Sequence, residues 1–349
     1  KALAQAGFKV VPIDVTRERI ASMLQDLKPD VAFNALHGKW GEDGCASALL
    51  ETLQIPYTHS GVLASSLAMH KEKSKTIFRS AGIPVAESRL VELEQAAAQH
   101  PMAPPYVVKP VAEGSSVGVH IVTSSANGPA SIILEQRDIF GSHAMVERFI
   151  PGKELTCAVI GDVALGVIDI VSQGSFYDYV SKYAPGGSRH ILPAEIPNAV
   201  YHKCQQYAIA AHRALGCRGV SRSDFRYNDT MGPEGELVLL ELNTQPGMTG
   251  TSLVPEMAQH AGHSFADLVT WMVNDASLDR RNTNPAPIIA NRKPSRSLLG
   301  GSASACVLPR GPPRWFFSAS RLPEVLCLAG ISNMKEVRGA SCRVRWRGL

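Results

Sequence analysis

The chain has little excess charge, few aromatic residues and no long apolar run. Its 349 residues include 35 lysines and arginines against 31 acids, and aromatic side chains make up only 6%. A nearly balanced chain lacks the basic character of nucleic-acid binders, so we expect no nucleic-acid partner. No apolar run approaches the roughly 18–20 residues that a membrane-spanning helix needs, and we expect no membrane partner either.

Cysteines are few and show no metal-binding or disulfide pattern. The seven cysteines form no CxxC pair and have no regular spacing, so neither a disulfide framework nor a zinc site is indicated. This usage is typical of a reducing compartment, and we expect a cytoplasmic protein. The chain starts at Lys1 without a signal-peptide pattern, so we expect it to begin inside a longer protein.

The first 60 residues alternate between strand and helix patterns. Residues 8–15 and 30–36 predict strands, and Ile20, Leu24 and Leu27 recur at helical spacing. Residues 2–7 are typical of the last turn of a helix. We therefore expect residues 1–60 to form a truncated N-terminal α/β domain, a parallel sheet that lacks its first strand.

The next two blocks predict sheets of another kind. Residues 61–149 predict a helix at 71–81 and then strands that lie too close together for crossover helices, which favours an antiparallel α+β module. Residues 150–280 predict a third domain, also of strands and helices. The expected fold class is α/β plus α+β. The predicted strands lie at 85–91, 106–111, 117–123, 144–149, 154–160, 163–171, 219–227 and 236–243, and the later helices at 199–215 and 265–276.

Residues 281–349 differ from the rest of the chain. They hold twelve lysines and arginines against two acids, are rich in Pro, Gly and Ser, and show no sustained apolar periodicity. We expect a basic tail that is disordered or translated from a non-native reading frame. A folded RNA-binding appendage that uses the aromatic residues at 315–317 is the alternative.

A lysine at the end of a strand stands beside a loop of small residues. Lys109 ends the predicted strand 106–111, and a loop rich in Gly and Ser follows at 113–118. Backbone N–H groups of such a loop can approach phosphate oxygens closely, which suits a polyphosphate. Because Lys109 precedes the glycines, the spacing is not that of a Walker P-loop. A surface hairpin with an incidental lysine is the alternative.

Three oxygen-bearing side chains come late in two predicted strands. Asp224 belongs to one strand, and Glu241 and Asn243 share one face of the other because they are two residues apart. A few oxygen ligands that leave room for phosphate and water suit Mg²⁺. The alternative is that these residues only cap a turn and end a strand.

Arg222 lies two residues before Asp224 and should point the same way. Its guanidinium and the unobstructed N–H of Gly247, in the glycine-containing turn 244–252, make a plausible pair of donors for an oxyanion. The alternative is a salt bridge from Arg222 to Glu241 or Asp224.

Weaker signals lie elsewhere in the chain. The extended segment 147–150 and the nearby Glu154 can read an adenine edge and ribose hydroxyls, although a linker at 151–152 is an equally good interpretation. Lys71 opens a predicted helix, where most lysines are solvated. His37 ends a predicted strand where parallel sheets place ligand groups, although a histidine there is more often structural.

Taken in order, these motifs resemble the ATP-grasp superfamily and, within it, the D-alanine–D-alanine ligases. The resemblance runs over residues 1–280 and implies a three-domain ligase. The pieces that carry it are His37-Gly-x-x-Gly-Glu-Asp-Gly44, Met69-His70-Lys71-x-x-Ser74-Lys75, Val108-Lys109-Pro110, Glu113-Gly-Ser-Ser-Val-Gly118, Phe176-Tyr-Asp-Tyr179, Lys182-Tyr183, Arg222-x-Asp224, Glu241-x-Asn-Thr-x-Pro-Gly-Met-Thr249 and Ser252-Leu253-Val-Pro255.

The resemblance implies a role for each matching residue. Those that would hold ATP are Lys71, Lys109, Ser116, Glu147, Arg148, Ile150, Glu154 and Lys182, with adenine and ribose on Glu147 and Glu154. Those that would bind two Mg²⁺ or Mn²⁺ ions are Asp224, Glu241 and Asn243. Those expected to take part in catalysis are His37, Ser115, Tyr183, Arg222 and Gly247, and those that meet the acceptor carboxylate are Ser252 and Leu253.

The implied reaction uses ATP to join two D-alanines for the bacterial cell wall. The γ-phosphoryl group activates the carboxylate of one D-alanine, and the amine of the second attacks the acyl phosphate. The pair at 182–183, in a predicted lid at 173–188, favours an amine acceptor. A ligase for D-lactate or D-serine, or an inactive nucleotide-binding fragment, is the alternative. We expect ATP and D-alanine as partners and a homodimer.

The sequence departs from the family in three places. The family begins with a strand and a glycine-rich loop whose acidic residue holds the ammonium group of the first D-alanine, and residues 1–60 contain neither. His70 stands where many relatives carry Asp, and because it only flanks Lys71 we expect little consequence. Residues 281–349 match nothing in the family.

Overall fold

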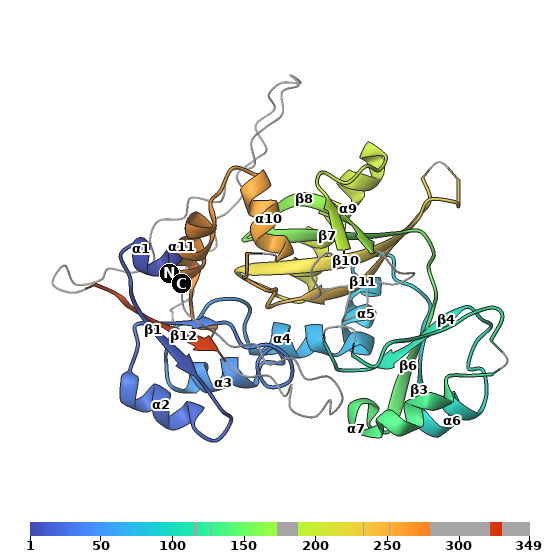
Figure 1. Ribbon diagram of the computed structural model, residues 1–349, viewed down its shortest axis with the longest axis horizontal. Helices are drawn as coiled ribbons and strands as arrows, with labels where there is room; N and C mark the ends of the chain where they lie inside the picture. The colour runs from blue at the N-terminus through green and yellow to red at the C-terminus, as the bar shows by residue number, and fades with distance from the viewer. Residues whose placement is uncertain are drawn as a thin grey trace.

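The fold consists of three sheets joined by packed helices (Figure 1). The computed structural model describes residues 1–114, 117–126, 128–172, 188–232, 234–250, 252–279 and 322–329. In Figure 1 the N-terminal sheet lies at the left, a five-stranded sheet at the centre and a four-stranded sheet at the right. No helix in these described ranges is both long and apolar enough to cross a membrane.

The N-terminal sheet is parallel and has three strands, in the order β1-β12-β2. Its two faces are covered by different helices, as a parallel sheet requires. Leu3 of α1 and Met272 of α11 pack on one face, whereas Leu24 of α2 and Leu50 of α3 pack on the other. The elements are α1 (Ala2–Gln5), β1 (Lys9–Asp14), α2 (Ile20–Leu27), β2 (Val31–Asn34), α3 (Cys45–Thr52), α11 (Phe265–Asp275) and β12 (Glu324–Ala329).

The four-stranded sheet is antiparallel, in the order β3-β6-β4-β5, and one face packs on short helices. These strands confirm the predicted antiparallel module. The elements are β3 (Ser88–Glu92), α6 (Leu93–Ala98), β4 (Tyr106–Pro110), β5 (His120–Val122), the 3₁₀ helix η1 (Ser131–Gln136), α7 (Arg137–Phe140) and β6 (His143–Arg148).

The five-stranded sheet is antiparallel, in the order β11-β10-β7-β8-β9. Residues of β7 alternate between two cores: Leu155 packs against α9, and Ala158 packs against α10 and α11. The elements are β7 (Lys153–Ile160), β8 (Val163–Ser172), β9 (Ser188–Ile191), α9 (Asn198–Ala214), β10 (Val220–Asn228), β11 (Glu236–Asn243) and α10 (Leu253–His260). The predicted fold class, α/β plus α+β, agrees with these three sheets.

Two helices after residue 61 do not belong to the module in which the sequence analysis placed them. α4 (Val62–Met69) and α5 (Lys71–Ser80) pack on the five-stranded sheet, where Ala68 and Phe78 join the same core as Phe225. Their apolar faces match that sheet, whereas the four-stranded sheet is covered by its own helices. The antiparallel sheet thus begins at β3, and the domain boundary at 61 stays a prediction.

A strand within residues 281–349 is a second correction to the sequence analysis. β12 lies between β1 and β2 and pairs with both, with Lys9 N–H donating to the Pro323 carbonyl at 2.9 Å and Ala35 N–H to the Leu328 carbonyl at 3.0 Å. Val325 and Leu326 are fully buried on opposite faces. In sequence, a strand buried on both faces is only a short apolar run without periodicity. The prediction missed this run because the residues around it are mostly Pro, Gly, Ser and Arg. The middle strand of this sheet therefore comes from residues 324–329 and not from residues 1–60.

We expect Leu326→Ala to destabilise the protein, because it removes a fully buried side chain between α2 and α3. The loss in free energy of unfolding should be about 2–5 kcal/mol, measured as a lower urea midpoint of the full chain. Leu322→Ala is the matched control, since Leu322 is 62% exposed and should change stability by less than about 0.5 kcal/mol. Equal midpoints for both variants would show that residues 324–329 do not form the middle strand.

Candidate active site

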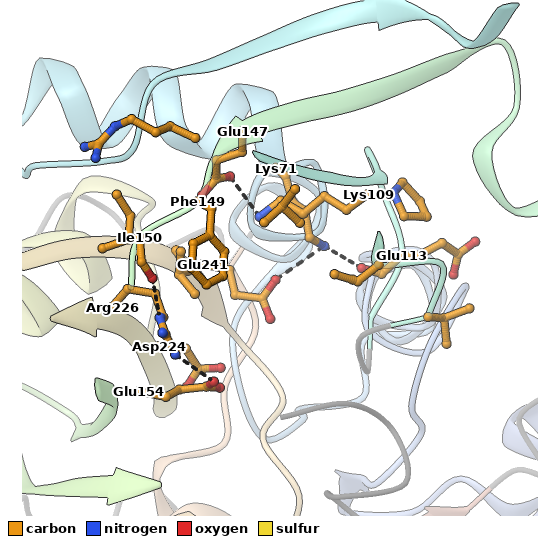
Figure 2. Close-up of a pocket in the computed structure, with 16 residues that line it drawn as sticks. Lys71, Lys109, Glu113, Glu147, Phe149, Ile150, Glu154, Asp224, Arg226 and Glu241 are labelled. Carbon is orange, nitrogen blue, oxygen red and sulfur yellow. Dashed lines mark hydrogen bonds and ion pairs between the residues drawn. The ribbon is translucent and has the colours of Figure 1, made fainter. Parts of the chain in front are cut away.

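The sequence-predicted residues that the structure describes line two adjoining cavities, which share Lys71, Glu113 and Glu241. Figure 2 shows the smaller of the two. The smaller cavity is also lined by Lys109 and Asp224. The larger, of about 480 Å³, has a volume within the range common for small-molecule sites. Residues in the middle of β10 and at the end of β11 therefore face the lysine of β4 across one cleft.

Two lysines reach the cleft from different elements. Lys71 is the first residue of α5, and its ammonium donates to the Glu113 carbonyl and lies 3.3 Å from Glu241 Oε2. His70 caps this helix, because its Nδ1 accepts a hydrogen bond from Lys73 N–H at 3.4 Å. Histidine thus takes a capping role that Asp also fills well. Lys109 lies on β4, with its ammonium 2.9 Å from Glu147 Oε2.

The three predicted metal ligands come together through the pairing of β10 with β11. Asp224 lies opposite Glu241 and Arg222 opposite Asn243, and the intervening Leu242 is buried on the other face. The spacing of two thus places Glu241 and Asn243 on one face of β11, and their role as metal ligands stays a prediction. Asn243 Oδ1 accepts from Gln245 N–H at 2.7 Å, which also closes the turn after β11.

Arg222 forms a bidentate ion pair with Asp224. Its Nε and Nη2 donate to the two carboxylate oxygens at 2.8 Å and 2.7 Å. Of the two salt bridges considered from the sequence, the one to Asp224 is therefore present. Asp224 lines the smaller cavity and Arg222 the larger, so the pair stands at the partition between them.

The oxygen ligands around Asp224 are few, so they fit a cation that takes its other ligands from phosphate and water. Among the described residues, no group of three or more His, Cys, Asp or Glu could hold a metal ion alone. Two carboxylates and one amide oxygen are present, since Asp224 and Glu241 are cross-strand partners and Asn243 follows Glu241 on the same face. Mg²⁺ is commonly held by one or two carboxylates together with phosphate and water, so these residues fit it.

The segment 147–154 joins β6 to β7 and forms one wall of the smaller cavity. Arg226 fixes this segment: its Nε donates to the Ile150 carbonyl at 3.0 Å and its Nη2 to the Gly152 carbonyl at 2.9 Å. Arg226 Nη1 also lies 3.6 Å from Glu154 Oε2 (Figure 2). Burial lowers the pKa of Arg226. The sequence analysis missed this residue, although the spacing of two that links Arg222 to Asp224 also extends to Arg226.

Glu147 and Arg148 point to different partners than the resemblance implies. The Glu147 carboxylate is 2% exposed and lies between the ammonium groups of Lys75 and Lys109. Burial alone would raise the pKa of Glu147, but these two charges outweigh it and hold the pKa below its usual value. The Arg148 side chain pairs with Glu236, whereas the neighbouring backbone lines the smaller cavity.

The remaining predicted residues line the larger cavity. His37 follows β2, with its Nδ1 2.9 Å from Glu42 Oε1. Ser252 occupies the N-cap position of α10, but its hydroxyl does not cap the helix and instead accepts from Thr249 N–H at 3.0 Å. A Cβ atom on Gly247 would lie 2.9 Å from the Ser252 hydroxyl oxygen, so a side chain at position 247 would require this hydroxyl to move. Leu253 completes this wall as the first residue of α10.

Four predicted site residues lie outside the described ranges. They are Ser115, Ser116, Lys182 and Tyr183. The predicted lid at 173–188 lies outside them too, except for its last residue.

The chain is similar in sequence to one enzyme family over most of its length. Residues 77–274 match the profile described as D-ala D-ala ligase C-terminus. The D-alanine–D-alanine ligase of Parvibaculum lavamentivorans is 58% identical over 280 residues, which is 80% of this chain and 91% of that protein. The D-alanine–D-alanine ligase of Methylobacterium radiotolerans is 59% identical over 280 residues, with the same shares of the two chains.

Solved structures agree with the sequence comparison. The D-alanine–D-alanine ligase of Bacillus anthracis, crystallised with ATP, superposes with a TM-score of 0.63 at 29% identity and covers 78% of this chain and 88% of its own. The VanG D-Ala:D-Ser ligase of Enterococcus faecalis has a TM-score of 0.57 at 30% identity and covers 70% and 72%. The expected ATP-grasp fold is confirmed. With more than half of its residues in the family profile and relatives near 58% identity, this chain belongs to the D-alanine–D-alanine ligase family.

Proposed function

We propose that this chain joins two D-alanine molecules into D-alanyl-D-alanine and converts ATP to ADP and phosphate. The observation that carries the proposal is the junction of two cavities at Lys71, Glu113 and Glu241. The smaller cavity is lined by the segment 147–154, called the hinge below, and by lysines suited to a nucleotide. The larger cavity is lined by the start of α10 and the turn after β11, which suit small carboxylates. The phosphoryl group would pass where they meet.

The reaction has two steps, and the chain needs no covalent nucleophile. A carboxylate oxygen of the first D-alanine forms a bond to the γ-phosphorus, and the bond to the β-γ bridging oxygen breaks to release ADP. The amine of the second D-alanine then attacks the acyl phosphate carbonyl, and phosphate leaves with the bonding electron pair. Lys71 and Lys109 would bind and orient the phosphates, which is most of what catalysis of phosphoryl transfer requires.

Each wall of the cleft has a proposed part in binding. Asp224, Glu241 and Asn243 would hold two Mg²⁺ or Mn²⁺ ions, which offset phosphate charge when bound. The backbone of the hinge and Glu154 would receive adenine and ribose. Arg222 and Gly247 N–H would donate to the oxyanion of the second step, since both line the larger cavity. His37 would assist in that cavity, and Ser252 with Leu253 would meet the acceptor carboxylate.

D-Alanine is the acceptor that the comparisons favour. The relatives near 58% identity are named D-alanine–D-alanine ligases, whereas the D-Ala:D-Ser ligase is a 30% identical neighbour. Lys182 and Tyr183, the sequence-based reason for an amine acceptor, lie outside the described residues. The homodimer and the cytoplasmic location stay predictions.

We expect Arg222→Ala to lower kcat by about 100-fold or more, the usual cost of removing one oxyanion donor. The measurement is phosphate release from ATP that depends on D-alanine. Arg213→Ala is the control, because Arg213 pairs only at the surface with Asp162 and its side chain is 62% exposed. Turnover by Arg222→Ala equal to that of the control would contradict the role of Arg222.

Lys109→Met tests the nucleotide side of the cleft. A hydrogen bond to a charged group contributes about 1.5–3 kcal/mol, so we expect KM for ATP to rise by about 10- to 100-fold. The KM for D-alanine should change little, because Lys109 lines only the smaller of the two cavities. Rates are measured against ATP at saturating D-alanine and then the reverse. A rise in the D-alanine KM alone would place the nucleotide elsewhere.

A further inference from the structure

A fully buried lysine lies behind the wall of the smaller cavity. Lys75 is on α5, one turn after Lys71, and is 0% exposed. Its ammonium is 3.0 Å from Glu147 Oε2, and the same oxygen is 2.9 Å from the ammonium of Lys109. One carboxylate oxygen is thus shared by two cations, of which only Lys109 lines the cavity.

Burying the Lys75 ammonium costs free energy of folding, so this lysine is better explained by a role in function than by a role in stability. Removing an ammonium group from water costs several kcal/mol, and an ion pair often does not recover that cost. Within the described part of the chain, Lys75 Nζ has no hydrogen bond of normal geometry, so the ion pair with Glu147 is its main compensation. Burial lowers the pKa of Lys75 to about 8 against the opposing effect of Glu147. An apolar side chain would fill the same space at lower cost.

The charges of the three groups explain what the lysine adds. Glu147 alone would neutralise Lys109, and the two would present little net charge to the cavity. With Lys75 on the other side of the carboxylate, the three groups together carry one positive charge. In a poorly solvated site this difference acts strongly on a neighbouring phosphate.

We propose that Lys75 is a positioning residue for nucleotide binding, which balances the charge of Glu147 so that the charge of Lys109 stays available to a phosphate of ATP. The proposal rests on the phosphate-binding role proposed above for Lys109. Lys75 itself does not line either cavity, and it acts through Glu147.

The test compares Lys75→Met with the double variant Lys75→Met/Glu147→Gln in the full-length chain. We expect Lys75→Met to raise KM for ATP by about tenfold, because Glu147 then neutralises Lys109, and to leave KM for D-alanine unchanged. In the double variant the amide of Gln still accepts a hydrogen bond from Lys109 but carries no charge. We therefore expect KM for ATP to return to within about threefold of the parent value.

Lys73→Met is the matched control, since Lys73 is an exposed lysine of the same helix and should leave both KM values unchanged. An equal or larger ATP defect in the double variant would overturn the proposal, because a merely structural lysine is not rescued by loss of a second charge. If Lys75→Met alone does not fold, the KM of the double variant decides: a value near that of the parent supports the proposal, and a raised value overturns it.

The variant Lys109→Met distinguishes a failure of the role proposed for Lys75 from a failure of the phosphate-binding role proposed for Lys109. If it raises KM for ATP while Lys75→Met does not, the role of Lys75 is wrong and the proposed function stands. If Lys109→Met leaves KM for ATP unchanged, the phosphate-binding role of Lys109 fails, and the role of Lys75 fails with it.

Discussion

The antiparallel pairing of β10 with β11 is the constraint on which the site depends. It sets Asp224 opposite Glu241 and Arg222 opposite Asn243. The opposite face of these strands is buried and carries no charge, with Phe225 packed against α9, and a shift by one residue would place charged side chains in that core. The apolar face thus holds the register that the polar face needs.

The charged side chains of the cleft form ion pairs with one another. Three ion pairs connect elements that are far apart in the sequence or lie at the partition of the cavities. They are Lys71–Glu241, Arg222–Asp224 and Lys109–Glu147. Such pairing keeps a cleft rich in lysine and carboxylate groups stable, because each buried charge has a compensating partner. When a triphosphate and its metal ions bind, the phosphates can replace the carboxylates as partners of the lysines, and the metal ions can replace the basic side chains as partners of the carboxylates.

The sequence predicts local features of this site better than its pairings. The spacing of two placed Arg222 and Asp224 on one face, helical spacing located α2, and the helix predicted at 199–215 corresponds to α9. Which acid Arg222 contacts depends on its rotamer and on the neighbouring strand, so two alternatives remained. The burial of Lys75 depends on the packing of α5 on the five-stranded sheet and on the ion pair with Glu147 of β6, and neither contact can be predicted from the sequence around Lys75. The strand at 324–329 was missed because its flanks have the composition of a disordered segment.

The position of β12 has a consequence for the order in which this protein can assemble on the ribosome. Lys9 and Glu324, paired in the finished sheet, are 315 residues apart. β1 and β2 are synthesised early, and the edge of each that will pair with β12 stays without hydrogen-bond partners. These edges, separated by the space for one strand, stay open until almost all of the other helices and strands have left the exit tunnel. Open strand edges are sites of intermolecular pairing, and contacts between distant residues slow folding. The nascent N-terminal sheet therefore stays incomplete until residues 324–329 have been made.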